Sequence, residues 1–175
     1  AVRSIEDGVL TLDGLASASI NDLYGMPHYP LDPEMGETFR AEWRFGVDAV
    51  VGMWDPALGF FSDESWTVSL SFSRTAIHST FENIDIPFEF SGMHDFSLTS
   101  SDMRSYQLMA DGIVLREGQL VQVLSSSRLS WGDSVEGAAS RSRWDYVRFG
   151  VVPETTSACL ICIGALIVTS THTRR

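Results

Sequence analysis

The stretch Phe39-Arg-Ala-Glu-Trp-Arg-Phe45 alternates without exception between uncharged and charged residues. Successive side chains of a β-strand point to opposite faces, so this stretch predicts a strand with one apolar and one charged face. Such two-sided strands are typical of antiparallel sheets, in which one face is buried and the other is wet. Residues 66–72 and 84–90 alternate in the same way, and Pro87, which lacks an N–H, places the latter strand at a sheet edge or a bulge.

Shorter strand-like segments occupy much of the chain around these three. They are residues 9–12, 96–99, 105–110, 113–117, 120–124, 128–131 and 144–149. Asp111-Gly112 joins two of them and predicts a hairpin with a type I′ turn. Roughly ten short strands without convincing helical periodicity predict an all-β fold, a two-sheet antiparallel sandwich, over residues 1–150.

The composition supports a folded domain and excludes one class of partner. Five Trp, ten Phe and four Tyr can supply a core, which excludes disorder for most of the chain. The formal net charge is −11, and phosphate binding needs a basic stripe, so we expect no nucleic-acid partner. We expect Trp43, Trp66 and Trp144, which fall within strand segments, to lie in the core.

The charge is unevenly distributed along the chain. Residues 1–150 carry ten arginines and twenty-two acids, for a net charge of −12, whereas residues 151–175 carry +1. Between Glu154 and Arg174 lie nineteen residues without formal charge, which as a helix span about 28 Å, close to a bilayer core. Arg174 and Arg175 predict that this C-terminal transmembrane helix ends in the cytoplasm and that the acidic body lies outside.

The segment 151–175 also resembles a known sorting signal. Its three parts are Val152-Pro153-Glu154-Thr155, the apolar run 158–168 and the final Arg174-Arg175. In all three parts the segment resembles the PEP-CTERM signal, which consists of a Val-Pro-Glu-Pro motif, a hydrophobic helix and a basic end. Thr155 departs from that pattern, which has proline there. The resemblance implies export, anchoring in the inner membrane and processing by an exosortase, followed by a cell-surface or extracellular location. Because the chain begins at Ala1, we expect that a signal peptide has been removed.

The body has a second family resemblance. Tyr106-Gln-Leu-Met-Ala-Asp-Gly-Ile-Val-Leu115 resembles the central hairpin of concanavalin A-like and laminin G-type jelly rolls. The ending Gly132-Asp133, followed by small residues and Trp144-Asp-Tyr-Val-Arg-Phe149, resembles that of bacterial PEP-CTERM proteins with this sandwich. Members of these families include lectins, glucanases and adhesive modules, so the resemblance implies a jelly-roll fold and leaves the activity open.

Enzymatic activity has one candidate motif. Some glucanases of this fold carry two or three acids on one strand face, and Glu82, Asp85 and Glu89 come nearest to that pattern. In a regular strand Glu82 points away from the other two, so we expect the polar face of an edge strand and no catalytic residues. No Gly-x-Ser-x-Gly motif occurs, and the body contains no cysteine.

Acidic residues in turns and at strand ends are candidate metal ligands. We predict no cofactor, with structural calcium as the alternative, because related sandwiches often hold this ion and calcium prefers oxygen ligands. The turn-rich or strand-end acids that could supply ligands are Asp7, Asp13, Asp133 and Asp145. Cys159 and Cys162 lie inside the apolar run, where we expect them to act as small hydrophobic residues.

Two loops are candidates for ligand binding because they combine aromatics with turn residues. One contains His28 and Tyr29 and the other Trp54 and Asp55. Aromatic faces can stack on sugar rings while Asp or His bonds the hydroxyl groups, although the same aromatics could instead plug the ends of the sandwich. The sequence therefore predicts an exported, non-enzymatic protein that binds glycan or extracellular polysaccharide, or alternatively a structural surface protein without a defined ligand.

Overall fold

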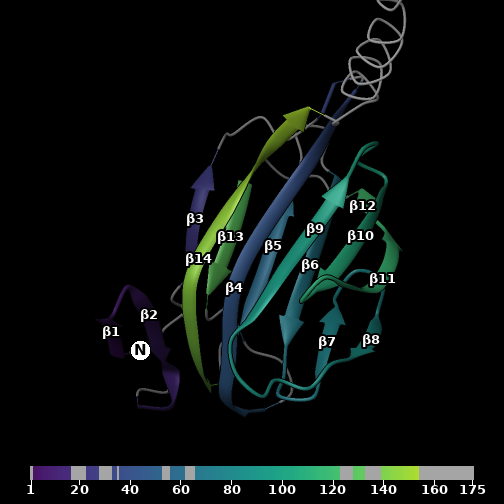
Figure 1. Cartoon of the computed structure of the whole chain (residues 1–175). Helices are drawn as coiled ribbons and strands as arrows, with labels where there is room; N and C mark the ends of the chain where they lie inside the picture. The colour runs from purple at the N-terminus through teal and green to yellow at the C-terminus, as the bar shows by residue number, and fades with distance from the viewer. Residues whose placement is uncertain are drawn as a thin grey trace, which may run out of the picture.

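Figure 1 shows the computed structural model, which describes residues 2–16, 23–27, 33–34, 36–52, 56–61, 66–122, 128–132 and 139–153. Apart from one short 3-10 turn, η1 (Gly14–Ala16), every regular element within these ranges is a β-strand. All their pairings are antiparallel. The expectation of an all-β body with two antiparallel sheets is therefore confirmed.

The strands form two sheets that lie one in front of the other in Figure 1. Sheet 1 has the order β1 (Val2–Glu6), β2 (Val9–Asp13), β14 (Ala139–Pro153), β4 (Glu37–Val51), β9 (His94–Ser100), β10 (Ser105–Ala110) and β11 (Ile113–Gln119). Sheet 2 has the order β3 (Leu23–Pro27), β13 (Arg128–Gly132), β5 (Ala57–Phe61), β6 (Trp66–Phe72), β7 (Ala76–Ser79) and β8 (Ile84–Pro87), with β12 (Val121–Gln122) paired to β6.

An aromatic cluster fills the space between the sheets. Phe45 of β4 lies at its centre, with its ring centroid 4.6 Å from Phe72 of β6 and 4.6 Å from Trp144 of β14. Such ring contacts add to the hydrophobic stabilisation that burial itself provides. Trp43 and Trp144 are fully or almost fully buried, as predicted, whereas Trp66 is only partly buried at the edge of the core.

Several local predictions are confirmed. Asp111 and Gly112 both have positive φ, 49° and 79°, as a type I′ turn requires. β8 is the last strand of sheet 2 and ends at Pro87, which agrees with the predicted edge position. A second Asp-Gly turn, Asp7-Gly8, joins β1 to β2 with φ values of 52° and 84°; it was not predicted because β1 was not recognised as a strand.

The two longest strands, β4 and β14, pair over nearly their whole length and contain two bulges. The register skips Asp48 on β4 and Asp145 on β14. A bulge adds one residue to one strand, so it shifts the alternation between inward and outward positions. On β14 the outward residues before the bulge include Arg141 and Arg143, and Arg148 faces outward after it.

A close contact between β10 and β11 requires a glycine. Gly118 is paired with Tyr106, whose side chain is buried. A Cβ atom on Gly118 would lie 2.4 Å from Cζ of the Tyr106 ring and 2.6 Å from its hydroxyl oxygen. The ring therefore occupies the space that any other residue at position 118 would need.

We expect Gly118→Ala to lower the free energy of unfolding by about 1–3 kcal/mol, because the added methyl group overpacks the site. Urea unfolding followed by tryptophan fluorescence measures this change. Gly92→Ala is the matched control, since a Cβ atom there meets nothing within 4 Å. Equal stabilities of the two variants would contradict the contact between Gly118 and Tyr106.

Candidate functional site

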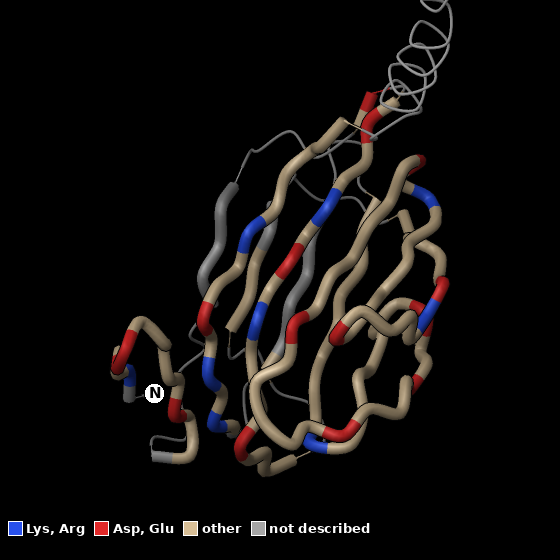
Figure 2. Tube along the Cα trace, in the orientation of Figure 1, with Lys and Arg blue, Asp and Glu red and all other residues tan. Residues whose placement is uncertain are grey.

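The outer face of sheet 1, the side that faces away from the core, is covered with charged residues. On β4 the residues Arg40, Glu42 and Arg44 alternate with fully buried apolar residues, so the charges share this face. Figure 2 shows basic and acidic positions alternating along β4, and mainly basic positions along the neighbouring β14. The charged half of the stretch 39–45 thus lies outside, as its pattern predicted.

Ion pairs connect the strands across this face. Arg143 of β14 bonds both carboxylate oxygens of Asp48, with Nη2 2.7 Å from Oδ1 and Nε 3.0 Å from Oδ2. Arg141 reaches Asp13 of β2 at 2.8 Å. Asp48 is one of the two bulged residues, so its carboxylate secures an irregular point of the β4–β14 pairing.

A row of polar side chains runs across four neighbouring strands of the face. The register places Arg40 of β4 opposite Thr99 of β9, Thr99 opposite Gln107 of β10, and Gln107 opposite Glu117 of β11. Gln107 Nε2 donates to Glu117 Oε1 at 3.3 Å. Since neighbouring strands lie about 4.8 Å apart, the row spans roughly 14 Å, which is longer than one sugar ring.

The row borders a groove of about 430 Å³ at one end of sheet 1. Its lining consists of hydroxyl, amide and carboxylate groups with one tyrosine and one glycine, at Thr38, Thr99, Ser100, Ser101, Ser105, Tyr106, Gln107, Glu117, Gly118 and Gln119. Most of these groups can both donate and accept hydrogen bonds. The groove therefore suits a hydroxyl-rich ligand better than an apolar one.

A second hollow lies across β4 from this groove. It has about 360 Å³ and is lined by Arg40, Glu42, Arg148, Phe149, Gly150, Val151 and Val152. Thr38 of the groove and Arg40 of the hollow belong to the same strand and face. The two depressions therefore flank β4, and a ligand lying along the polar row would contact both.

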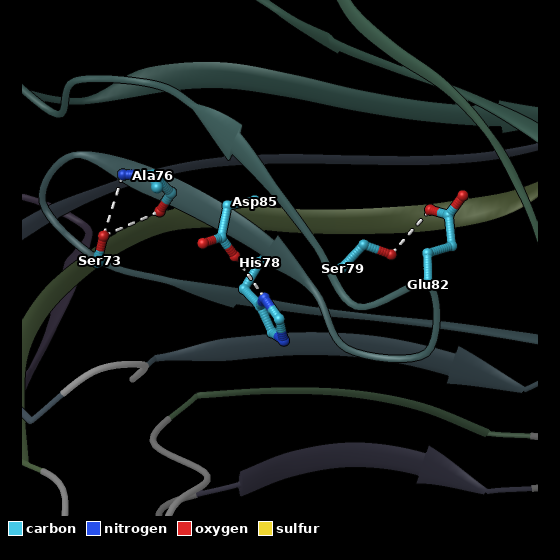
Figure 3. A network of polar contacts seen from close by, with 6 residues as sticks. All are labelled: Ser73, Ala76, His78, Ser79, Glu82 and Asp85. Atoms are coloured by element: carbon cyan, nitrogen blue, oxygen red, sulfur yellow. Dashed lines mark hydrogen bonds and ion pairs between the residues drawn. The ribbon is translucent and has the colours of Figure 1, made fainter.

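The groove rests on a partly buried polar cluster around Glu82, which joins the sheets. Glu82 lies in the turn between β7 and β8 of sheet 2 and accepts hydrogen bonds from Tyr106 and from Arg116 of β11 (2.9 Å). It also accepts from the Gln119 backbone N–H (3.2 Å) and from the Ser79 hydroxyl (2.9 Å), the latter drawn in Figure 3. Tyr106 and Gln119 line the groove, so this cluster fixes part of its wall.

Burial and hydrogen bonding shift the acidities within the cluster. Burial by itself would raise the pKa of Glu82, but the four donors, Tyr106 foremost, hold this pKa below its usual value. Burial, assisted by the bond to Glu82, raises the pKa of Tyr106 to about 12. At neutral pH the carboxylate is therefore charged and the phenol is protonated, which is the state in which the phenol donates to the carboxylate.

The predicted ligand-binding and sorting residues fall mainly outside the described part of the chain. This applies to His28, Tyr29, Trp54, Asp55, Glu154, Thr155, Arg174, Arg175 and the predicted transmembrane helix. Val152 and Pro153 are described, and they form the end of β14 opposite Thr38 and Glu37. Among the residues that the structure describes, no helix is long and apolar enough to span a membrane.

The residues considered for calcium have other roles where the structure describes them. Asp7 forms a hairpin turn, Asp13 bonds Arg141, and Asp145 lies 3.8 Å from Arg44, while Asp133 is outside the described residues. Within the described ranges no three His, Cys, Asp or Glu residues are grouped so that they could hold a metal ion.

The three acidic residues that come nearest to a catalytic motif do not share a common set of contacts. Asp85 contacts His78 at 2.7 Å, and Glu82 belongs to the cluster with Tyr106. Figure 3 shows the Asp85 carboxylate directed at His78 and the Glu82 carboxylate directed at Ser79. Glu89 is exposed and follows the end of β8.

The groove residues carry no sequence motif that marks them as a site. The alternation of 39–45 identified Arg40 and Glu42 as outward-facing. The predicted turn at Asp111-Gly112 would place Gln107 opposite Arg116, and a bulge at Leu115, which was not predicted, shifts the pairing of Gln107 to Glu117. The missing information was the pairing of β4 with β9 and β14, which connects segments far apart in the sequence.

The Glu82 cluster predicts a pH-dependent stability. Because the pKa of Glu82 is lowered by folding, its stabilising contribution is complete above its ordinary value of 4.5 and is lost as the pH falls through the lowered value. We expect Glu82→Gln to lower the free energy of unfolding by about 2 kcal/mol at pH 7. The difference in the free energy of unfolding between wild type and variant should narrow at a second, acidic pH below the lowered pKa, where the wild-type carboxyl is protonated.

Urea unfolding at both pH values measures this difference. Glu89→Gln removes an exposed carboxylate near the same strand and serves as the control, for which we expect little change at either pH. If Glu82→Gln lowers the free energy of unfolding by the same amount at both pH values, the lowered pKa of Glu82 is contradicted.

Comparisons with known proteins identify the fold. No family model matches the chain, and no curated protein matches it in sequence. Among solved structures, a carbohydrate esterase of the Shiga toxin-encoding bacteriophage phi24B is similar with a TM-score of 0.61 and 10% identity, over 83% of this chain and 81% of that one. An alginate lyase of polysaccharide lyase family 7 has a TM-score of 0.54 and 8% identity, over 86% and 82%.

A binding domain is similar as well. The metal-free carbohydrate recognition domain of Emp46p has a TM-score of 0.51 and 12% identity, over 85% of this chain and 84% of that domain. At these identities the likeness concerns the fold, which the chain shares with both enzymes and binding domains. The chain therefore has the two-sheet β-sandwich fold of these proteins.

Proposed function

We propose that the outer face of sheet 1 binds a carbohydrate polymer and that the protein is a non-enzymatic glycan-binding module of the concanavalin A-like jelly-roll type. The observation that carries this proposal is the polar row Arg40–Thr99–Gln107–Glu117 beside a groove of about 430 Å³. An open, elongated and polar surface of this kind fits a chain of sugar rings better than a compact small molecule.

The chemistry of the row suits sugar hydroxyl groups. Carboxylate and amide groups can bond two neighbouring hydroxyls at once, and the hydrogen bond from Gln107 to Glu117 holds one group of each kind side by side on the row. The face is secured by ion pairs across β2, β14 and β4, so little ordering is needed on binding. The fold is also that of an esterase, a lyase and a recognition domain whose names all refer to carbohydrates.

A binding role is favoured over catalysis because the acidic residues nearest to a glucanase pattern are engaged elsewhere. Glu82 accepts four hydrogen bonds and supports the groove wall, and Asp85 contacts His78. Glycosidases need two carboxylates that face one substrate together, whereas Glu82 and Asp85 are directed at different partners, which supports binding over catalysis.

Affinity gel electrophoresis with soluble polysaccharides tests the proposal. We expect the protein to be retarded by at least one polymer among a β-glucan, a galactan, alginate and polygalacturonate. Gln107→Ala and Glu117→Gln should each weaken binding about three- to tenfold, which corresponds to the loss of one hydrogen bond.

Glu89→Gln is the control for Glu117→Gln, since both residues are exposed but only Glu117 lines the groove. We expect the control to bind as wild type does. If no polymer retards the protein, or if the groove variants bind as tightly as the control, glycan binding at this face is refuted and the structural role without a ligand is favoured.

We further propose that the body is exported and held at the inner membrane by residues 154–175 until an exosortase processes it. The support is the sequence pattern of Val152-Pro153-Glu154-Thr155, the apolar run and Arg174-Arg175. β14 ends at Pro153, so this segment follows directly from the end of a strand of sheet 1. The protein would then act at the cell surface or in the extracellular polysaccharide.

Membrane fractionation tests the anchor. Two aspartates in the apolar run, Leu160→Asp and Leu166→Asp, should move the full-length protein from the membrane to the soluble fraction, because each costs about 3 kcal/mol at a helix centre. Thr156→Asp, just before the run, is the control and should remain in the membrane. Identical fractionation of all three proteins would rule out the anchor, and processing is tested by comparing hosts with and without an exosortase gene.

A further inference from the structure

The hollow between β4 and β14 contains two arginines that share one carboxylate. Glu42 Oε1 lies 2.6 Å from Arg40 Nη2, and Glu42 Oε2 lies 2.6 Å from Arg148 Nε. Both oxygens of the carboxylate are therefore engaged, one by each guanidinium. Two positive charges against one negative charge leave this group of three residues with a net charge of +1.

The two guanidinium groups remain accessible. The side chains of Arg40 and Arg148 are 50% and 67% exposed, whereas that of Glu42 is only 18% exposed. Each guanidinium has five N–H donors, and the contact with Glu42 uses only a fraction of them. Arg148 also lies over the Tyr146 ring, with Cζ 5.1 Å from its centroid, which helps to hold this guanidinium in place.

Space for a ligand group lies directly beside these donors. Gly150 of β14 is opposite Arg40 in the register, and a Cβ atom built on Gly150 meets nothing within 4 Å. Gly150 also lines the hollow together with both arginines. The missing side chain therefore leaves open volume where a planar acid group could approach both guanidinium groups.

Resting on the proposed glycan binding at this face, we infer that the Arg40–Glu42–Arg148 group receives the carboxylate of an acidic sugar, so that the bound polymer is a polyuronate. A neutral ring placed over the hollow would cover one guanidinium charge without compensating it, which is unfavourable. A carboxylate would neutralise the excess charge and could form a bidentate pair with a guanidinium.

The position of the hollow relative to the groove supports a polymer. Arg40 lines the hollow and also begins the polar row that borders the groove, because it lies opposite Gly150 on one side and opposite Thr99 on the other. A chain laid along the polar row would place hydroxyl groups over Gln107 and Glu117 and an acid group over β4 and β14. The arginine pair would then select acidic sugars, although the chain as a whole carries a net charge of −11.

The test compares each polyuronate with its own carboxyl-reduced form, which keeps the linkage and length but is neutral. Isothermal titration calorimetry with polygalacturonate and alginate oligosaccharides, native and reduced, gives the four affinities. We expect wild type to bind at least one native oligosaccharide about tenfold or more tightly than its reduced form.

Substitution of the two arginines tests whether they cause the preference for the native, charged oligosaccharide. Arg40→Gln and Arg148→Gln should each reduce this preference, the ratio of native to reduced affinity within one variant, to about threefold or less. Arg148→Gln, which lies outside the polar row, should leave the affinity for the reduced form nearly unchanged. Arg148→Lys, which keeps the charge but loses the planar fork, should retain part of the preference. Arg74→Gln removes an exposed arginine in the turn between β6 and β7 of the other sheet, and it should bind as wild type does. Circular dichroism verifies that each variant is folded.

Equal affinity for native and reduced oligosaccharides would overturn this inference and leave glycan binding intact. A preference that survives in both glutamine variants would overturn the assignment to Arg40 and Arg148. If these oligosaccharides and the neutral polymers all fail to bind, the proposed function itself is refuted, which is a distinct result.

Discussion

β4 and β14 pair along nearly their whole length, and the position of each charged residue on the outer face depends on this pairing. It brings Arg148 next to Glu42 and Arg143 next to Asp48. It also gives β2 a partner, because β14 is the only strand between β2 and β4 in sheet 1. The bulges at Asp48 and Asp145 shift the alternation so that Arg141, Arg143 and Arg148 all face outward.

The Glu82 cluster has a complementary role, since it joins the two sheets by polar contacts outside the aromatic core. The Glu82 carboxylate accepts four hydrogen bonds, one of them from its ion-pair partner Arg116, and these contacts offset the cost of its partial burial. Loss of one partner would leave the others unsatisfied, and such networks therefore fix a single arrangement. Here the fixed arrangement includes Tyr106 and Gln119, two residues of the groove wall.

Local patterns allowed some of these features to be predicted from the sequence. Seven alternating residues were enough to identify β4 and its two faces, and Asp111-Gly112 identified the hairpin of β10 and β11. The bulge at Leu115, which brings Glu117 opposite Gln107, has no signal in the pattern. The full length of β14 was not predicted, because the bulge at Asp145 moves its outward residues from odd to even positions. Nor could periodicity show which strands are neighbours, so the meeting of Arg40 with Thr99 and Arg148 required the structure.

The late position of β14 in the sequence has a consequence for synthesis of the chain. Glu42 and Arg148 are 106 residues apart, and a ribosome needs roughly 5 to 20 seconds to add that many residues. During this time the edge of β4 that receives β14 has no partner, and Phe45 lacks its contact with Trp144. Sheet 1 can be completed only after translation of residues 139–153, so the nascent chain exposes this strand edge until its last described strand has been made.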